Sequence, residues 1–442
     1  MTQGISDSTA SNSNKFFGWW IATACFFFSM VTLGVISLGF TALFEPIATQ
    51  FGWSYAQVSL ASSIQSLVSI ILLPLIGIIV DRYGTKRLLF FGVILICLGY
   101  VLLSNVNSLG MLYFSFVVLS LGSTACGGLT LNITLTYWFK RRLSLALGIN
   151  SCGSAIGGLL IPVITLLVDN YDLKIAILII AAGILVVLLP MAFVLSKKPN
   201  KSNSEIEDSD NTAADVVAQQ NRPRKTASPA APVKLMQILK NKVLILIMLA
   251  YLSQMLIINA VSVHIMPYLS SIGINRVNSS LIASLASLCG ILGSLGLGWL
   301  GIKMAKKTTA TIAFAFTVVS LLLIALSSTV GSWVLAIYVV CWGISFGGTT
   351  TLQAALLKEY FGKNHFATIV SLLMVVIQIG GLLGPLIAGA AYDKWSSYQG
   401  IWFIFAGLAL LSALCIIALP SINKIETHEP MLGNVKAING KN

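Results

Sequence analysis

Charged side chains are scarce in this sequence: Asp, Glu, Lys and Arg together make up 9% of its 442 residues. A water-soluble domain carries about 25% charged residues, which it needs to cover its surface. Hydrophobic residues make up 57% of the chain, and the mean hydropathy is +0.90. A water-soluble globular fold is therefore excluded, and much of the surface is expected to face lipid.

Motifs for catalysis are also missing. The sequence has no phosphate-binding loop of the Walker type, no pairing of a nucleophile with a base, and no metal-ligand spacing. The seven cysteines all fall within apolar stretches, and we interpret them as packing residues. We therefore predict no enzyme activity, no catalytic residue, no cofactor and no metal site.

Apolar stretches recur along the whole chain, many near the roughly 20 residues that a helix needs to span a bilayer. Glycine is frequent within them, as expected where helices pack closely in lipid. The short alternating segments of a membrane β-barrel are absent. We predict an all-α membrane protein with about twelve transmembrane helices. The expected spans are 17–41, 55–79, 87–105, 109–135, 143–168, 173–195, 242–268, 279–301, 308–328, 332–357, 365–391 and 398–420.

Polar segments divide the chain into two bundles of six helices. Residues 1–16 are predicted to be a disordered tail, because they are rich in Ser, Asn and Thr and have no basic start of a secretory signal. Residues 196–241 are polar, contain proline and show no periodicity, which predicts a disordered cytoplasmic linker. The bundles are then 17–195 and 242–420, followed by a C-terminal tail at 421–442.

Basic residues predict the orientation in the membrane. If both termini are cytoplasmic, 24 of the 27 Lys and Arg residues lie on the cytoplasmic side, and only Lys174, Arg276 and Lys394 do not. This matches the excess of basic residues in the cytoplasmic loops of membrane proteins. The net charge of +13 thus belongs to a membrane surface, and no nucleic-acid partner is expected.

The two halves are also an approximate repeat. GIIVDRYGTKR at 77–87 is matched by GWLGIKMAKKT at 298–308, and YWFKRRLSLALGI at 137–149 by EYFGKNHFATIVS at 359–371, each pair lying about 221 or 222 residues apart. Two parallel repeats of six helices joined by a linker are the plan of a secondary transporter.

The first of these motifs resembles the loop signature G-x-x-x-D-R-x-G-x-[RK]-[RK] of the major facilitator superfamily. Within it, the chain most resembles the bacterial monocarboxylate-transporter and oxalate/formate-antiporter branch, through Gly18-Trp19-Trp20, FGWSYAQVS at 51–59 and HIMPYLSSIGI at 264–274. The resemblance implies a monomeric secondary active transporter in a prokaryotic inner membrane. It would move a small organic solute by alternating access, with a monocarboxylate and a coupled proton as candidates. The alternatives are an exporter of neutral or hydrophobic compounds and a transporter-like sensor that does not translocate.

The loop signature is predicted to gate the transporter. Asp81 is the one acid in a basic loop, so it can accept charge-assisted hydrogen bonds from a neighbouring helix end or Arg when the cytoplasmic side is closed. Glycine at 77 and 84 allows close helix approach and a turn. The alternative is a basic anchor on anionic lipid. The gating residues are Gly77, Asp81, Arg82, Gly84, Lys86 and Arg87.

The resemblance also implies that the first, fourth, seventh and tenth helices line a central cavity. Polar residues recur on one side of these helices, as expected where polar atoms turn away from lipid. The alternative is that they hydrogen-bond between helices and touch no solute. The predicted cavity residues are Asn132, Tyr251, Gln254, Asn259, Trp342, Thr349 and Gln353.

The possible charge-carrying residues are few. His264 is the only histidine within a predicted span, so it is the candidate for a coupled proton, against the alternative of an interhelical hydrogen bond. Many relatives carry an Arg, an acid and a Lys where this chain has Ser294, Gly290 and Leu38. No Lys or Arg lies in the middle of any span, so a carboxylate would have to bind amide, hydroxyl and helix-end donors. The alternative is a neutral or protonated solute.

Overall fold

The structure is a computed structural model that describes residues 18–139, 142–195, 241–362 and 366–420. The predicted tails, and the predicted linker apart from residue 241, lie outside these ranges. Within them the chain is helical and contains no β-strand.

The helices form two bundles. The N-terminal bundle comprises α1 (Gly18–Val31), the π-helical η1 (Thr32–Leu38), α2 (Phe40–Phe51), α3 (Tyr55–Ser104), α4 (Leu109–Ala125), α5 (Gly128–Trp138), α6 (Leu143–Ile156), the short 3₁₀ turn η2 (Gly157–Leu159), α7 (Leu160–Asn170) and α8 (Leu173–Val194). The C-terminal bundle comprises α11 (Lys242–Ser271), α12 (Arg276–Lys303), α13 (Lys306–Val330), α14 (Val334–Phe361), α15 (Phe366–Trp395) and α16 (Gln399–Ile417).

The longest helix, α3, contains two membrane spans. Its 50 residues would extend about 75 Å as one straight helix, more than twice the roughly 30 Å hydrocarbon core of a bilayer. Gly84 interrupts it with φ 79° and ψ 157°, a conformation that glycine adopts without strain. The described part of the chain has 11 apolar helical stretches long enough to cross a membrane. With α3 counted twice they give the predicted twelve spans, so the predicted fold class is confirmed.

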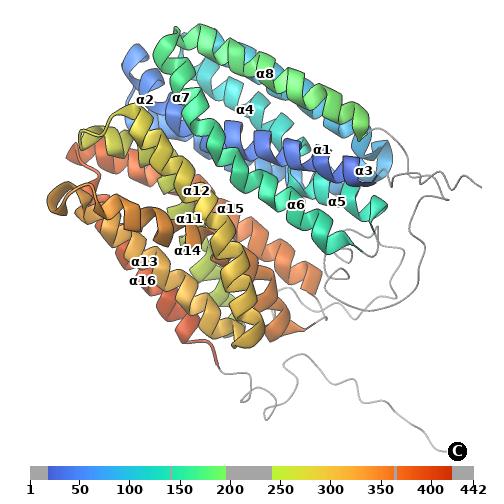
Figure 1. The fold of residues 1–442 in the computed structure, drawn as a ribbon, viewed down its shortest axis with the longest axis vertical. Helices are drawn as coiled ribbons and strands as arrows, with labels where there is room; N and C mark the ends of the chain where they lie inside the picture. Colours follow the sequence, from blue (N-terminus) through green and yellow to red (C-terminus); the bar gives the residue numbers. More distant parts are fainter. Residues whose placement is uncertain (1–17, 140–141, 196–240, 363–365, 421–442) are drawn as a thin grey trace, which may run out of the picture.

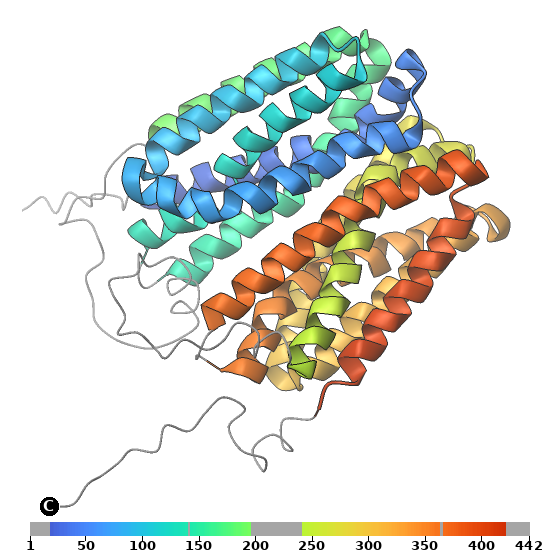
Figure 2. The same cartoon turned by 180° about the vertical axis from the view of Figure 1, so that it is seen from behind.

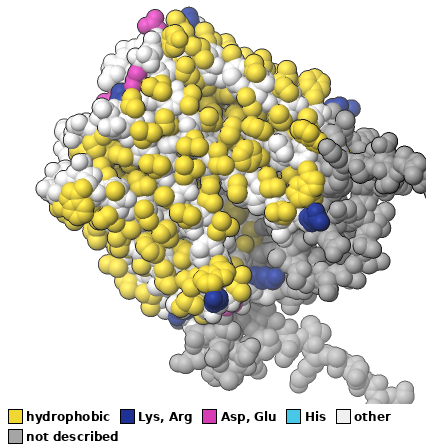
Figure 3. All heavy atoms as spheres, viewed as in Figure 1, with side chains coloured by type: hydrophobic (Ala, Val, Ile, Leu, Met, Phe, Trp, Pro, Cys, Tyr) yellow, Lys and Arg dark blue, Asp and Glu magenta, His cyan; other side chains and the backbone are white. Residues whose placement is uncertain are grey.

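The two bundles lie side by side (Figures 1 and 2), with the N-terminal bundle in blue to green and the C-terminal bundle in yellow to red. They touch at the end that carries Glu45, Tyr55, Arg276 and Asp393, which we call the closed end. The other end, which we call the open end, carries the Gly84 interruption. Figure 3 shows a largely hydrophobic outer surface with Lys and Arg at its edges, as expected for a protein surrounded by lipid.

Glycines bring the helices close together within each bundle. A Cβ atom on Gly347 of α14 would lie 1.9 Å from the carbonyl oxygen of Gly290 on α12. In the N-terminal bundle, a Cβ atom on Gly34 of η1 would lie 2.3 Å from the carbonyl oxygen of Gly157 in η2. Backbones therefore touch at both places, which is the small-residue packing typical of membrane helices.

Candidate functional site

A cavity of about 510 Å³ lies against the N-terminal bundle. Its wall comes from α1, η1, the first half of α3, the α4–α5 region and α6, with Gln378 of α15 from the other bundle. Hydroxyl and amide groups predominate in the lining, among them Ser29, Thr32, Gln65, Asn132 and Asn150, and no charged side chain is among the lining residues. The cavity can therefore hydrogen-bond a solute but offers no charge to it.

Three side chains of this cavity form one hydrogen-bonded chain. Ser29 Oγ donates to Asn150 Oδ1 at 2.5 Å, and Asn150 Nδ2 donates to Asn132 Oδ1 at 3.3 Å. A side-chain amide has two N–H donors, so the Asn132 amide keeps donors that these bonds do not use. These hydrogen bonds fix the rotamer of Asn150, which is buried, whereas Asn132 remains at the cavity surface.

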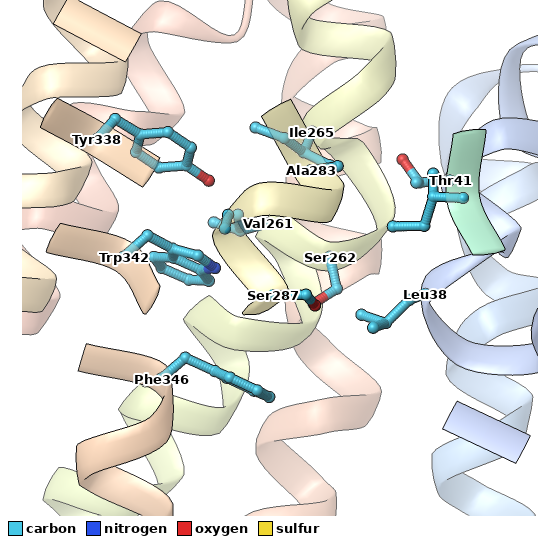
Figure 4. A pocket seen from close by; sticks show the side chains of 12 residues that line it. Leu38, Thr41, Val261, Ser262, Ile265, Ala283, Ser287, Tyr338, Trp342 and Phe346 are labelled. Atoms are coloured by element: carbon cyan, nitrogen blue, oxygen red, sulfur yellow. The ribbon is translucent and has the colours of Figure 1, made fainter. Parts of the chain in front are cut away.

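A second, smaller cavity of about 30 Å³ lies between the bundles and is shown in Figure 4. The side chains of Tyr338, Trp342 and Phe346 follow one face of α14 and point toward Leu38 and Thr41 of the N-terminal bundle. The Tyr338 and Trp342 rings are stacked, with centroids 6.1 Å apart and planes at 23°. We call this cavity the Trp342 pocket, and its wall is largely apolar.

Leu38, Gly290 and Ser294 stand at the three positions where the resemblance implies charged residues. Leu38 lines the Trp342 pocket directly, and the backbone of Gly290 lies against Phe346, whose ring atom would be 3.3 Å from a Cβ there. Ser294, one helical turn further along α12, hydrogen-bonds Thr351 across to α14 at 2.5 Å. All three positions are uncharged in this chain, and no charged residue is among those that line the Trp342 pocket.

Arg276, the first residue of α12, joins the bundles at the closed end. Its Nε donates to Asp169 Oδ1 at 2.8 Å, its Nη1 to Glu45 Oε2 at 3.3 Å and its Nη2 to the Ala42 carbonyl at 2.9 Å. Ser270 Oγ adds a bond to Glu45 Oε1 at 3.0 Å. These charged side chains are one-fifth to one-third exposed, so water still screens them.

Asp393 of α15 joins the bundles beside this cluster. Its two carboxylate oxygens accept from the backbone N–H groups of Tyr55 and Ala56, each at 2.8 Å. These are the first two residues of α3, whose N–H groups have no partner within the helix. A negative charge at a helix N-terminus is also favoured by the helix dipole. Asp393 thus binds the start of a helix in the opposite bundle.

His264 of α11 is completely buried at the same end. Its Nε2 lies 3.0 Å from the Pro385 carbonyl oxygen and 3.1 Å from Ser59 Oγ of the opposite bundle. Its Nδ1 lies 2.8 Å from the Tyr398 hydroxyl, and its ring packs edge-on against Phe44 at 4.9 Å between centroids. The imidazole therefore contacts both bundles.

The predicted cavity residues occupy three different environments. Asn132 lines the larger cavity and Trp342 the smaller one. Inside the C-terminal bundle, Tyr251 donates to the Thr349 carbonyl at 3.3 Å, and Gln254 bonds Thr317 and Ser345. These three bonds are the interhelical alternative stated above. Tyr251, Gln254 and Thr349 do not line the 510 Å³ cavity in this conformation, so their contact with a solute remains a prediction.

The remaining two predicted residues, Asn259 and Gln353, are half-buried. Asn259 donates to the Met255 carbonyl of its own helix at 3.0 Å and lies against Gly381 of α15. Gln353 has a buried Nε2 with no hydrogen-bond partner among the described residues. Neither lines the 510 Å³ cavity, so their role also stays a prediction.

The predicted gating loop lies at the open end. Asp81, Arg82, Lys86 and Arg87 are exposed, and no ion pair of Asp81 occurs within the described ranges. No neighbouring atom lies within 4 Å of a Cβ built on Gly77 or Gly84. The predicted gating bond of Asp81 is therefore not made among the described residues, and its formation in the opposite conformation remains a prediction.

Several residues at these sites were not expected from the sequence. Glu45 and Asp393 both bond across the bundles. The sequence gives no sign of these bonds, because the partners, Arg276 and the start of α3, are distant in sequence. Asn150 was missed because the resemblance assigned the cavity to other helices, although a polar amide in an apolar stretch was a usable signal.

Comparisons with known proteins agree with this architecture. A family model described as Major Facilitator Superfamily matches residues 19–356 and 265–430. Monocarboxylate transporter 12 of Mus musculus is 25% identical over 96% of this chain and 89% of its own, and monocarboxylate transporter 2 of Mus musculus is 24% identical over 92% and 85%.

Among solved structures, the nucleoside transporter NupG superposes with a TM-score of 0.71 at 15% identity, covering 90% of this chain and 98% of its own. At that identity the likeness shows the fold alone. The sequence relatives and the family model agree with the resemblance seen in the loop signature. Because the model matches most of the chain, this multi-pass membrane protein belongs to the major facilitator superfamily and is a secondary transporter of small solutes.

Proposed function

We propose that this transporter carries a small organic solute in uncharged form, and that a monocarboxylic acid crosses together with the proton that neutralises it. The observation that carries this proposal is the 510 Å³ cavity, which is lined by hydroxyl and amide groups and by no charged side chain. The relatives named monocarboxylate transporters, which align over more than nine-tenths of the chain, support the class of solute.

Electrostatics favours the neutral form of such an acid. A carboxylate leaving water loses strong hydration, and hydrogen bonds to charged partners, worth about 1.5–3 kcal/mol each, are what normally offset that loss. At the positions where the resemblance implies charge, this chain has Leu38, which lines the Trp342 pocket, and Gly290 and Ser294 of α12. A protonated acid needs only neutral donors and acceptors, which the Ser29–Asn150–Asn132 chain supplies.

The open end is proposed to face the cytoplasm of a prokaryotic cell, with the protein acting as a monomer in the inner membrane. The distribution of basic residues supports this orientation, because the loop of Arg82, Lys86 and Arg87 is at the open end. The conformation described is then inward-facing, with the closed end sealing the outer side.

Orientation can be measured with single cysteines in a cysteine-free background. Asn107 is exposed between α3 and α4 at the closed end, and Lys86 is exposed at the open end. In intact cells an impermeant thiol reagent should label Asn107→Cys and leave Lys86→Cys unlabelled. Labelling in the reverse pattern would contradict the proposed orientation, and disruption of the cells should make both sites reactive.

Uptake by purified protein in proteoliposomes tests the solute. Labelled lactate should accumulate when the outside is acidic, and lactamide, its uncharged amide, should enter without needing a pH gradient. Asn150→Leu keeps the volume similar but breaks the hydrogen-bonded chain, so uptake of both should fall roughly tenfold, since one lost bond contributes about 1 kcal/mol and leaves partners unpaired. Serine 151 also lines the cavity but bonds only its own helix at the Leu147 carbonyl, so Ser151→Ala is the matched control.

Failure of the wild-type protein to move either compound would refute the proposed solute class. A second candidate is export of a neutral compound with an apolar ring, which the stacked Tyr338 and Trp342 favour. Efflux of a neutral aromatic solute from loaded vesicles, without lactate uptake, would support that candidate. Absence of any exchange across the membrane for any bound solute would point to a sensor.

A further inference from the structure

The protonation state of His264 is fixed by its partners at the closed end. The Pro385 carbonyl oxygen can only accept a hydrogen bond, so Nε2 must carry hydrogen. Ser59 Oγ donates its own hydrogen to the Tyr55 carbonyl at 2.6 Å, so toward Nε2 it too acts as an acceptor. The third partner, the Tyr398 hydroxyl, then donates to Nδ1 at 2.8 Å. All of these bonds are satisfied by the neutral ring.

A protonated ring would not fit this closed arrangement. With hydrogen on both nitrogens, Nδ1 would have to donate to Tyr398, whose hydroxyl hydrogen would lose its acceptor. The ring is completely buried, and a buried cation without a paired carboxylate costs several kcal/mol. The closed end therefore accepts His264 only in its neutral form.

The charged and titratable groups around the ring are all engaged elsewhere. Asp393 of α15 holds the N–H groups of Tyr55 and Ala56, and Glu45 of α2 holds Arg276 and Ser270. Three further tyrosines flank the site. Tyr392 of α15 stacks with Tyr55 of α3 and with Tyr398, and Tyr268 of α11 bonds the Ile324 carbonyl and Ser327. Among the described residues, none of these carboxylates makes a hydrogen bond or ion pair with His264.

Opening the closed end must uncover this histidine. Ser59 and Phe44 belong to the N-terminal bundle and His264 to the C-terminal bundle, so separation of the bundles removes both contacts and exposes the ring to the cleft that a solute enters. A histidine in water titrates near pH 6.5, within the range of an acidified exterior. Among the described residues it is the one histidine, and the cavity lining adds no other cation.

We propose that His264 is the proton-loading site of this transporter, which binds an incoming carboxylate as the imidazolium and then transfers its proton to it. The transfer breaks the Nδ1–H bond and forms a carboxylic O–H bond, so the solute leaves as a neutral acid and the ring returns to the neutral form that the closed end requires. Closing is thereby coupled to proton transfer. The proposal rests on the proposed function, since it needs a carboxylate solute that crosses in protonated form.

The linkage has a definite sign. The closed end binds one proton fewer at His264 than the opened end, so acid favours the opened end and base favours the closed end. Below about pH 6.5, each fall of one pH unit shifts the equilibrium between the closed and the opened end by at most tenfold, because a single group titrates. Accumulation of a carboxylate should therefore rise as the exterior is acidified, whereas transport of an uncharged analogue should not need acid.

His264→Gln tests this proposal, because an amide can donate to Pro385 and accept from Tyr398 but cannot take a proton. In proteoliposomes with the outside at pH 5.5 and the inside at pH 7.5, the variant should lose at least tenfold in the initial rate of lactate uptake. Its lactamide uptake should stay within about twofold of wild type, which shows that the variant folds and cycles.

Tyr398→Phe is the matched variant, because it removes the hydroxyl partner but keeps the titratable ring. It should retain acid-driven lactate accumulation. Acid-driven lactate uptake by His264→Gln at the wild-type rate would overturn the proposal while the proposed function stands. Equal loss in Tyr398→Phe would also overturn it, because the ring would then serve only as a structural contact. Failure of wild type to move lactate and lactamide would instead refute the proposed function.

Discussion

Asp393 shows how a single side chain can hold two bundles together and still release them. Its bonds to Tyr55 and Ala56 use N–H groups that every helix start leaves open, so no dedicated partner side chain is needed. Gly389, one turn earlier in α15, allows this approach, because a Cβ there would lie 2.8 Å from the Tyr55 carbonyl oxygen. When the bundles part, water can take over both sets of groups.

Asp393→Asn should weaken the closed end. The substitution removes the charge and turns an amide NH₂ toward a backbone N–H, so one of two charge-assisted bonds is lost, at about 1.5–3 kcal/mol. The population of the opened end should rise roughly tenfold or more. Spin labels on the exposed residues Gln50 and Ser332, which lie on opposite bundles, should then show a larger share of long distances.

Asp172→Asn provides the comparison for this measurement. Asp172 is an exposed carboxylate at the start of α8 and makes no side-chain capping bond. Its removal changes the same charge without touching the contact between bundles. Equal label distances in Asp393→Asn and wild type would show that the aromatic stack and Arg276 suffice to hold the closed end.

Residues of this kind were poorly predictable from the sequence. Asp393 and Tyr55 are 338 positions apart, and Arg276 and Glu45 are 231 apart, so no local pattern links them. Asn132 was predictable because the period of a helix places a polar residue on an inward face. The hydrogen-bond partner of a polar residue depends on how two bundles meet, which periodicity does not contain.

At the scale of elements, the π-helical η1 connects the two cavities. Leu33 and Ser37 line the larger cavity and Leu38 the Trp342 pocket. Gly34, between them, touches the backbone of Gly157, where α6 gives way to the 3₁₀ turn η2. Single π-helical turns occur frequently at functional sites, and this one lies where the first and fifth spans are in backbone contact.

Gly34→Ala should therefore damage the protein. The added methyl group would lie 2.3 Å from the Gly157 carbonyl oxygen, which is backbone and has no rotamer that can move away. Overpacking of this kind costs typically about 1–3 kcal/mol. We expect a clear fall in Tm in detergent and a loss of uptake, measured on the same preparation.

Gly148→Ala is the control for this change, because it lies on α6 and a Cβ there meets nothing within 4 Å. Alanine is preferred over glycine within a helix by roughly 0.5–1 kcal/mol, so its Tm should be equal or slightly higher. A Gly34→Ala variant as stable and active as Gly148→Ala would show that η1 can separate from η2.

At the scale of the whole molecule, the sequence was sufficient for the architecture. A bilayer demands long apolar helices, and this constraint is written in composition, so the spans and the two-bundle plan were predictable. The repeat of the Gly77–Arg87 motif at 298–308 pointed to two equivalent halves. The conformation was not predictable, because both states of a transporter use the same helices and differ only in which end of the bundles touches.

That ambiguity makes the open end the site of the last prediction. Asp81 is exposed there without an ion pair in the described residues, and its counterpart in the second half, Ile302, is 84% exposed and carries no charge. If Asp81 accepts charge-assisted hydrogen bonds once the open end closes, Asp81→Asn removes about 1.5–3 kcal/mol from that state alone. Turnover should then fall roughly tenfold or more, with the protein still folded and inserted.

Spin labels on Ser144 of α6 and Lys358 of α14, both exposed at the open end, should report the cause. In Asp81→Asn most of the label distances should be the long ones of the conformation with this end open. Ile302→Asn changes the matching position without removing a carboxylate, so it should keep the wild-type distribution of distances. Since Asp81 makes no hydrogen bond or ion pair among the described residues, its loss is not expected to act by weakening this conformation. A variant with normal turnover and an unchanged mixture would therefore mean that the basic loop serves only to contact lipid, and that the open end closes through other residues.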